Sequence, residues 1–139
     1  MSEEAKQLVR SIFAELDSAQ SGEPFRKYGA DNYVAHVPGM PPLDREGMVH
    51  FGSAFYQAFP GLNHEILEAI SEGDNVSVRL RISGKHDGPL AMPAGTVPPT
   101  GRAIAWDAQN VIHVSGGKVV EHWLSMDTAD MMRQLGLMG

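Results

Sequence analysis

The chain has 139 residues, a net charge of −6 and no cysteine, with 42% hydrophobic and 20% charged residues. This length and composition predict one globular domain spanning residues 1–139. The lack of cysteine excludes disulfides, thiolate nucleophiles and cysteine-ligated zinc, and the acidic balance argues against a nucleic-acid partner. Because no apolar run has the length of a membrane span and the N-terminus lacks a signal-peptide pattern, we expect a cytoplasmic protein that does not bind membranes.

The N-terminal part of the chain is predicted to be mainly helical. Apolar residues recur at helical spacing over residues 3–20 and again over 45–59, where Asp44 is the expected N-cap. Residues 23–28 predict a short helix that begins with a proline. A brief apolar strand is expected over residues 33–37, between the short helix and the longer one that follows it.

The C-terminal part changes to the two-residue period of strands. Residues 62–71 and 76–83 alternate on either side of a glycine-containing turn, and residues 104–127 predict a long hairpin. Residues 88–101 are rich in proline and glycine, so we expect a loop beside the sheet, in the position of a lid, with Met92 reaching inward. Helices followed by antiparallel strands predict an α+β fold with the helices on one face of the sheet.

One face of the predicted hairpin is apolar but carries an amide and an imidazole. Its members are Ile104, Trp106, Ala108, Asn110, Ile112 and Val114 on the first strand and Val120, His122, Leu124 and Met126 on the second. Buried polar groups such as Asn110 and His122 are either satisfied internally or line a pocket. Trp106 is either ordinary core or a flat wall for a ring-shaped ligand.

Three of the six histidines are predicted to face inward, namely His36, His86 and His122. Any one of them can be a hydrogen-bonded core residue, whereas the three together favour a polar-lined cavity. We expect no metal site, because they lie on separate elements without a fixed i, i+4 pair. Asp127 is either the N-cap of a last short helix or an acid at the cavity mouth. Trp123 is predicted on the outer face, where an exposed tryptophan suggests a dimer interface.

Short motifs in this order resemble the SnoaL-like polyketide cyclases of the NTF2-like superfamily. The motifs are Ala58-Phe59-Pro60-Gly61, Glu72-Gly73-Asp74-Asn75-Val76, Gly84-Lys85-His86-Asp87-Gly88, Pro98-Pro99-Thr100-Gly101-Arg102, Gly117-Lys118-Val119-Val120-Glu121-His122-Trp123, Asp127 and Gln134-Leu135-Gly136. The resemblance implies a cone in which a curved antiparallel sheet and N-terminal helices enclose an apolar pocket. It also implies a homodimer through the convex sheet face, and ring closure by aldol condensation without a metal or organic cofactor.

The resemblance places the catalytic residues of the cyclases at positions that this chain has changed. In those enzymes an aspartate on the last strand moves the proton, and that position is Leu124 here. A histidine position on the preceding strand is Asn110, and a neighbouring glutamine position is Ala108. His86 and Asp127 match family positions, and His122 lies within the matching Glu-His-Trp pattern.

The leading hypothesis is a pocket for a small, oxygenated, apolar molecule, with cofactor-independent cyclase, isomerase or lyase chemistry by proton transfer. The assigned roles are His122 as central acid/base, Asp127 as second acid, and His36, His86, Trp106 and Asn110 as substrate-binding residues. One alternative is a non-catalytic binding module, favoured by Leu124, and another is a structural protein whose cavity is filled by side chains. Epoxide hydrolases and ketosteroid isomerases share the wider fold but need a carboxylate in the pocket, which the inward faces lack.

Overall fold

The computed structural model describes residues 2–92 and 95–137, which form four helices and seven strands. In chain order these are α1 (Ser2–Ala19), α2 (Pro24–Tyr28), β1 (Gly29–His36), α3 (Arg45–Ala58), β2 (Asn63–Glu72), β3 (Asn75–Lys85), β4 (Leu90–Met92), β5 (Gly95–Val97), β6 (Ala103–Ser115), β7 (Lys118–Met126) and α4 (Thr128–Gln134). None of the described helices has both the length and the hydropathy needed to cross a membrane.

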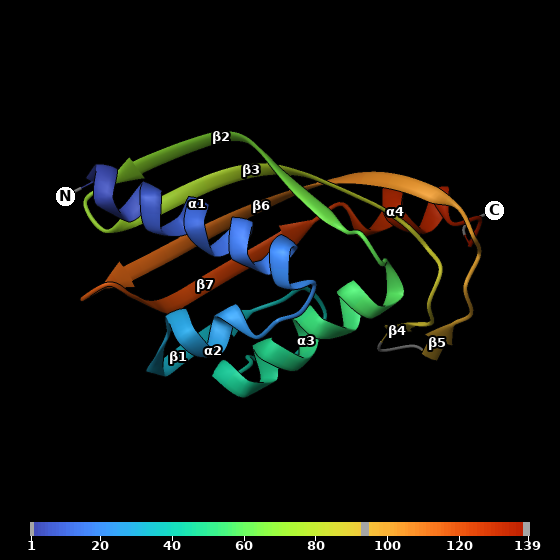
Figure 1. Cartoon of the computed structure of the whole chain (residues 1–139), viewed down its shortest axis with the longest axis horizontal. Helices are drawn as coiled ribbons and strands as arrows, with labels where there is room; N and C mark the ends of the chain where they lie inside the picture. Colours follow the sequence, from blue (N-terminus) through green and yellow to red (C-terminus); the bar gives the residue numbers. More distant parts are fainter. Residues whose placement is uncertain (1, 93–94, 138–139) are drawn as a thin grey trace.

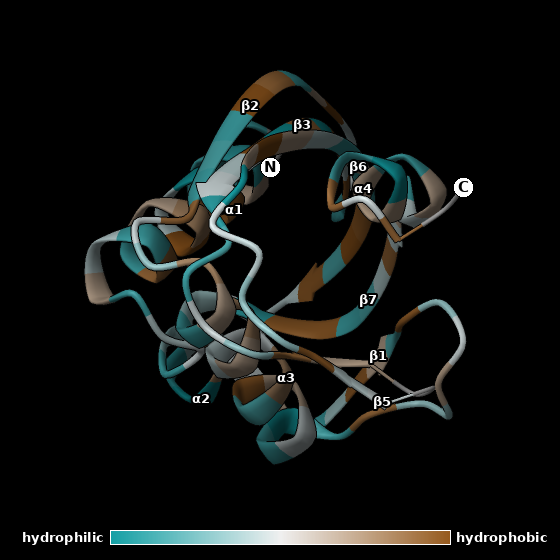
Figure 2. Cartoon of the chain, turned by 90° about the vertical axis from the view of Figure 1, so that its right-hand side faces the viewer, coloured by the Kyte–Doolittle hydropathy of each residue, from teal (hydrophilic) through white to brown (hydrophobic). Residues whose placement is uncertain are grey.

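Five of the strands form one curved sheet in the order β1-β7-β6-β3-β2. Figure 1 shows α1 lying along one face of this sheet, and the end-on view of Figure 2 shows α1, α2 and α3 on the side toward which the sheet curves. The predicted α+β class is confirmed. The sheet is mixed rather than wholly antiparallel, because β1 runs parallel to β7 while the other neighbours are antiparallel.

The two central strands have the alternation that their sequences predict. β3 and β6 pair without interruption from Asn75↔His113 to Lys85↔Ala103. Their inward side chains are at most 5% exposed: Val76, Val78, Leu80 and Ile82 on β3, and Ile104, Trp106, Ala108, Asn110, Ile112 and Val114 on β6. The core of the protein therefore lies between this face and the helices.

One inward position of β7 differs from the prediction. Gly116 and Gly117 form the turn with φ of 59° and 76°, and the β6–β7 register shifts by a bulge beside it. A bulge places an extra residue in one strand, which changes the face of the residues next to it. Val119 is therefore buried in place of Val120, while His122 keeps its predicted inward position.

The segment 88–101 lies apart from the main sheet, as predicted. It contains a small hairpin that the sequence did not predict, in which β4 pairs with β5. Residues 93–94 between these strands lie outside the described residues.

The helix starts and the apolar stripe of α1 agree with the sequence prediction. Asp44 caps α3 by accepting a hydrogen bond from the Gly47 N–H at 2.7 Å, and Pro24 lies in the first turn of α2. The buried stripe of α1 comprises Ala5, Val9, Ile12, Phe13 and Leu16. Helical spacing thus identified both the helix and the face that packs on the sheet.

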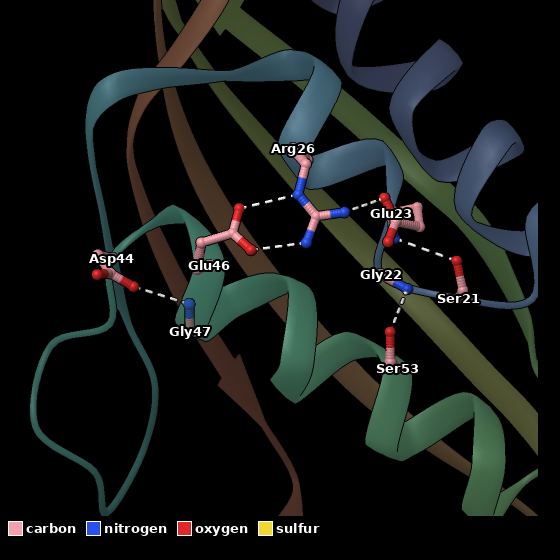
Figure 3. Close-up of polar contacts among 8 residues, drawn as sticks. All are labelled: Ser21, Gly22, Glu23, Arg26, Asp44, Glu46, Gly47 and Ser53. Carbon is pink, nitrogen blue, oxygen red and sulfur yellow. Dashed lines mark hydrogen bonds and ion pairs between the residues drawn. The ribbon is translucent and has the colours of Figure 1, made fainter.

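Polar contacts fix α2 and the preceding turn to α3 (Figure 3). Arg26 donates to both carboxylate oxygens of Glu46, at 2.9 and 2.6 Å, and the Gly22 N–H donates to Ser53 Oγ at 2.9 Å. A side chain at Gly22 would place its Cβ 2.1 Å from the Val49 carbonyl oxygen, so only glycine permits this approach. These contacts hold the helices where they cover the concave side of the sheet.

Candidate active site

An apolar cavity of about 70 Å³ lies between the inward face of the sheet and the N-terminal helices. Its apolar lining comprises Phe13, Leu16, Phe25, Met48, Phe51, Gly52, Phe55, Leu62, Leu80, Ile82, Leu124 and Met126. Five side chains with polar atoms complete the wall: Tyr56, His64, Trp106, Asn110 and His122. An apolar wall with a few placed polar groups is typical of a small-molecule site, in which the polar groups orient the ligand.

A larger cleft of about 540 Å³ adjoins the cavity. Phe51, Phe55 and Met126 line both spaces, and Met92 lines the cleft together with Met40. The segment that carries Met92 therefore borders the approach to the cavity, in agreement with its predicted position. A ligand entering from this side has to pass the two phenylalanines and Met126.

At one end of the cavity, Tyr33, His122 and Asn110 form a buried hydrogen-bonded chain. The Tyr33 hydroxyl lies 3.1 Å from His122 Nδ1, and His122 Nε2 is hydrogen-bonded to Asn110 Oδ1. Because the amide oxygen can only accept, Nε2 carries the ring proton and Nδ1 accepts from the tyrosine hydroxyl. Both ring nitrogens of His122 are therefore occupied.

Burial keeps this chain uncharged. All three side chains are at most 3% exposed. Burial lowers the pKa of His122 to about 4 and raises the pKa of Tyr33, since a charged group is poorly solvated in an apolar interior. At neutral pH the imidazole and the phenol are therefore both neutral.

Two hydrogen-bond donors of the cavity wall have no partner among the described residues. They are the Asn110 Nδ2 amide group and the Trp106 Nε1–H, and both are buried. A buried donor without an acceptor costs about 1–3 kcal/mol, so such groups favour a ligand that brings an acceptor oxygen. Trp106 and Asn110 were predicted as binding residues, and the structure places both on the cavity.

A second polar cluster on the cavity was missed by the sequence analysis. Asp17 Oδ1 lies 2.7 Å from His64 Nδ1 and accepts a hydrogen bond from the Tyr56 hydroxyl, also at 2.7 Å. Asp17 Oδ2 accepts from the backbone N–H of His64 at 2.7 Å. The cluster brings together α1, α3 and the start of β2.

One sequence signal points to this cluster. Asp17 follows Phe13 by four residues, so an acidic side chain occupies the edge of the buried stripe of α1. The same alternation that turns Ile66 toward the core places His64 inward, but a bulge between Ile66 and Glu68 makes the pattern of β2 irregular. The loose alternation therefore hid the inward histidine.

His86 is buried as predicted but does not line the cavity. The Thr100 N–H donates to His86 Nδ1 at 3.1 Å, and the ring packs against Phe59 with centroids 5.2 Å apart. Burial lowers the pKa of His86. These contacts tie the ends of the segment 88–101 together, and the expected contact of His86 with a ligand stays a prediction.

The expected inward position of His36 is wrong. His36 Nε2 lies 2.7 Å from Glu121 on β7, and the imidazole stacks on Trp123 with centroids 5.3 Å apart. In β1 the neighbouring Ala35 takes the inward position and is 0% exposed, so His36 lies on the outer face. A short strand of five residues did not provide enough alternation to assign its faces.

Asp127 occupies the first of its two predicted roles. Its side chain accepts a hydrogen bond from the Asp130 N–H at 3.0 Å and caps α4. It is absent from the lining of the cavity. Leu124 does line the cavity, directly opposite Asn110 in the β6–β7 pairing. Among the described residues, no three histidine, aspartate or glutamate side chains are grouped closely enough to hold a metal ion.

The family of the chain follows from comparison with known proteins. The model of the SnoaL-like polyketide cyclases matches residues 7–135. The chain therefore belongs to the SnoaL-like polyketide cyclase family, and it has the NTF2-like fold that its motifs predicted. Comparison with curated proteins gives no match.

Solved structures similar to this chain cover it almost completely. A SnoaL-like protein from Jannaschia sp. CCS1, assigned as a polyketide cyclase, has a TM-score of 0.86 at 20% identity, over 100% of this chain and 96% of that one. AclR from Streptomyces galilaeus, assigned as a hydroxylase, has a TM-score of 0.86 at 24% identity, over 100% of both chains. IdmH from Streptomyces antibioticus, assigned as a polyketide cyclase, has a TM-score of 0.78 at 28% identity, over 95% of this chain and 98% of that one.

Proposed function

We propose that this protein binds a small, largely apolar molecule with an acceptor oxygen and acts on it by cofactor-independent proton transfer, as in cyclisation or isomerisation. The observation that carries the proposal is the pair of unpartnered donors, Asn110 Nδ2 and Trp106 Nε1, in a largely apolar wall. A carbonyl oxygen of the ligand satisfies such a donor, and the hydrogen bond polarises the carbonyl for reaction.

His122 supports this site as a positioning residue in the proposal. Its hydrogen bond fixes the amide oxygen of Asn110 and so turns the amide nitrogen away from the ring. The acid/base role expected for His122 from the sequence remains a prediction. The contacts favour positioning, because its pKa is lowered to about 4 and its only lone pair already accepts from Tyr33.

A non-catalytic binding function is the second candidate. The family resemblance implies that Leu124 stands at the position of the cyclases' catalytic aspartate, and its side chain lines the cavity. Leucine cannot exchange a proton, so the remaining contacts at this end of the cavity bind and orient a ligand without changing it. The two candidates share the binding step and differ in whether the ligand is recovered unchanged.

Paired ligands that differ only in the acceptor oxygen test the binding step. Cyclohexanone and methylenecyclohexane have nearly the same shape, and ligand-observed NMR measures the affinity of each. In the wild type, the ketone should bind more tightly than the hydrocarbon. In the double variant Trp106→Phe/Asn110→Leu, this preference should be about tenfold smaller, because a hydrogen bond contributes about 1.4 kcal/mol.

The matched control carries the same substitutions on the exterior, Trp123→Phe and Asn75→Leu, both at exposed positions. The control should retain the wild-type ratio. An unchanged ratio in the cavity variant would remove the basis for the proposed function.

A further inference from the structure

We propose that His64, held by Asp17 and Tyr56, is the proton-accepting residue of the cavity and acts on a carbon next to a ligand carbonyl bound at Trp106. The inference rests on the proposed function, because it requires a carbonyl compound in the cavity. It assigns the chemistry to residues that neither the family motifs nor the sequence analysis identified.

The hydrogen bonds of Asp17 determine which nitrogen of His64 is free. An ionised carboxylate can only accept, so at 2.7 Å from Asp17 Oδ1 the His64 Nδ1 has to carry the ring proton. His64 Nε2 then holds the lone pair, and it has no hydrogen-bond partner among the described residues. This tautomer, oriented by a partly buried carboxylate, is the one that lets a histidine act as a general base.

The environment of Asp17 keeps it ionised. Burial raises the pKa of Asp17, but the hydrogen bonds from the His64 ring, the His64 backbone and the Tyr56 hydroxyl outweigh burial, and the pKa is lowered overall. The Asp17 and His64 side chains are 19% and 12% exposed. A carboxylate in this position stabilises the imidazolium that forms when His64 accepts a proton.

His64 differs from His122 in what it can do. The cavity has two histidines, and both nitrogens of His122 are engaged by neutral partners, Tyr33 and Asn110. Among residues 2–92 and 95–137, no carboxylate is hydrogen-bonded to His122, so a proton on it would be buried without compensation. His64 has both an available lone pair and a carboxylate partner, so the geometry equips it, and not His122, to accept a proton.

The sheet places His64 level with Trp106. His64 is paired with Ile82 on β3, and Ile82 is paired with Trp106 on β6. Opposed residues of antiparallel strands share a face, and two strand spacings separate their Cα atoms by about 10 Å. Both side chains line the cavity, and Trp106 Nε1 is one of its unpartnered donors. A molecule held between them presents its carbonyl to the indole and the adjacent carbon to the imidazole.

The proposed step is a proton transfer without an oxidant or reductant. The C–H bond next to the carbonyl breaks, its proton bonds to His64 Nε2, and the electron pair forms an enolate whose oxygen accepts a hydrogen bond from Trp106 Nε1. The imidazolium then returns a proton to a carbon of the enolate. In deuterated water the returned proton is replaced by deuterium, so exchange at that carbon reports the step.

The test follows deuterium exchange into cyclohexanone by NMR, with binding of the same ketone measured in parallel. General-base catalysis contributes about 10²–10⁴-fold, so His64→Gln should lower the protein-catalysed exchange rate at least about 100-fold while the ketone still binds. His113→Gln is the matched control, because His113 lies on the outer face opposite Glu121 and should exchange ketone protons at the wild-type rate. Exchange that persists at the wild-type rate in His64→Gln would overturn the assignment.

Separate outcomes distinguish the two proposals. If the ketone binds in the wild type but no exchange occurs, the role of His64 is wrong and the binding site stands. If the ketone does not bind, the proposed function fails and the inference fails with it.

The tautomer gives a second measurement that needs no variant of His64: long-range ¹H–¹⁵N spectra should show the proton on Nδ1 in the wild type, and a proton on Nε2 would refute the proposal.

Asp17 is a positioning residue in this scheme, and the tautomer also tests its role. Asp17→Asn should shift the His64 ring proton away from Nδ1 and slow exchange, because an amide can donate to Nδ1 where the carboxylate could only accept. A merely structural role of Asp17 would leave the tautomer unchanged in the folded variant.

Discussion

The buried imidazole of His122 should make the protein lose stability between about pH 6.5 and pH 4. An unfolded chain has a histidine pKa near 6.5, and the folded protein lowers it to about 4 by burial. In this window the unfolded state binds more protons, so the free energy of unfolding rises with pH. The stability that this residue contributes is complete above the unfolded pKa and is lost as the pH falls toward the folded one.

The size of the effect follows from the two pKa values. At about pH 5 the wild type should be about 2 kcal/mol less stable than at about pH 8 from His122 alone, and the loss should approach about 3 kcal/mol below pH 4. His122→Gln cannot take up the proton, so its pH dependence should be shallower by these amounts. Urea unfolding at a series of pH values measures the difference directly.

Other titrating groups are common to both proteins and cancel in the comparison. His113→Gln on the outer face serves as the control for replacing an imidazole outside the cavity. If the free energy of unfolding depends on pH equally in the wild type and in His122→Gln, His122 is protonated in the folded state at little cost. That result would refute the conclusion that burial keeps His122 neutral. If the variant does not fold, NMR titration of the His122 ring in the wild type provides the same information.

Three further predictions concern packing and assembly. Gly22→Ala should lower the free energy of unfolding, measured in urea, by about 1–3 kcal/mol, because its Cβ would lie 2.1 Å from the Val49 carbonyl oxygen. Ser53→Ala loses only one hydrogen bond to the same turn and should lower it by about 1 kcal/mol. Tyr33→Phe should cost about 1–2 kcal/mol in the same assay, since it leaves a buried imidazole nitrogen without a donor; no change would show that this hydrogen bond is absent. Trp123 is 40% exposed on the outer face. If the homodimer expected from the family resemblance uses this face, Trp123→Glu should shift sedimentation toward the monomer. A sedimentation profile equal to that of the wild type would exclude this interface.

Local sequence patterns were sufficient for most of the secondary structure. The apolar stripe of α1, the cap at Asp44 and the alternation of β3 and β6 are properties of a few consecutive residues, and each has the predicted structure. Strand alternation also placed Trp106 and Asn110 on the inward face. Long, regular strands permit such assignments because a register error would bury many polar side chains at once.

The same patterns did not predict the faces of residues beside a bulge or in a short strand. The bulge beside Gly117 exchanged Val120 for Val119, and the five-residue strand predicted over residues 33–37 was too short to assign the face of His36. His86 is inward by parity, yet the parity of a strand does not distinguish a cavity wall from a core contact. The distinction depends on which residues of other elements fill the space in front of the side chain.

The residues of this chain by themselves determined its family, its α+β class and which face of β6 is buried. These properties depend on local periodicity and on motifs made of a few consecutive residues. Only the tertiary structure decided the chemistry of the cavity. Asp17, Tyr56 and His64 lie on three elements, and the hydrogen bonds that select the His64 tautomer form only when those elements pack. Hydrogen bonds act over about 3 Å, so sequence spacing of tens of residues carries no information about them until the fold closes that distance.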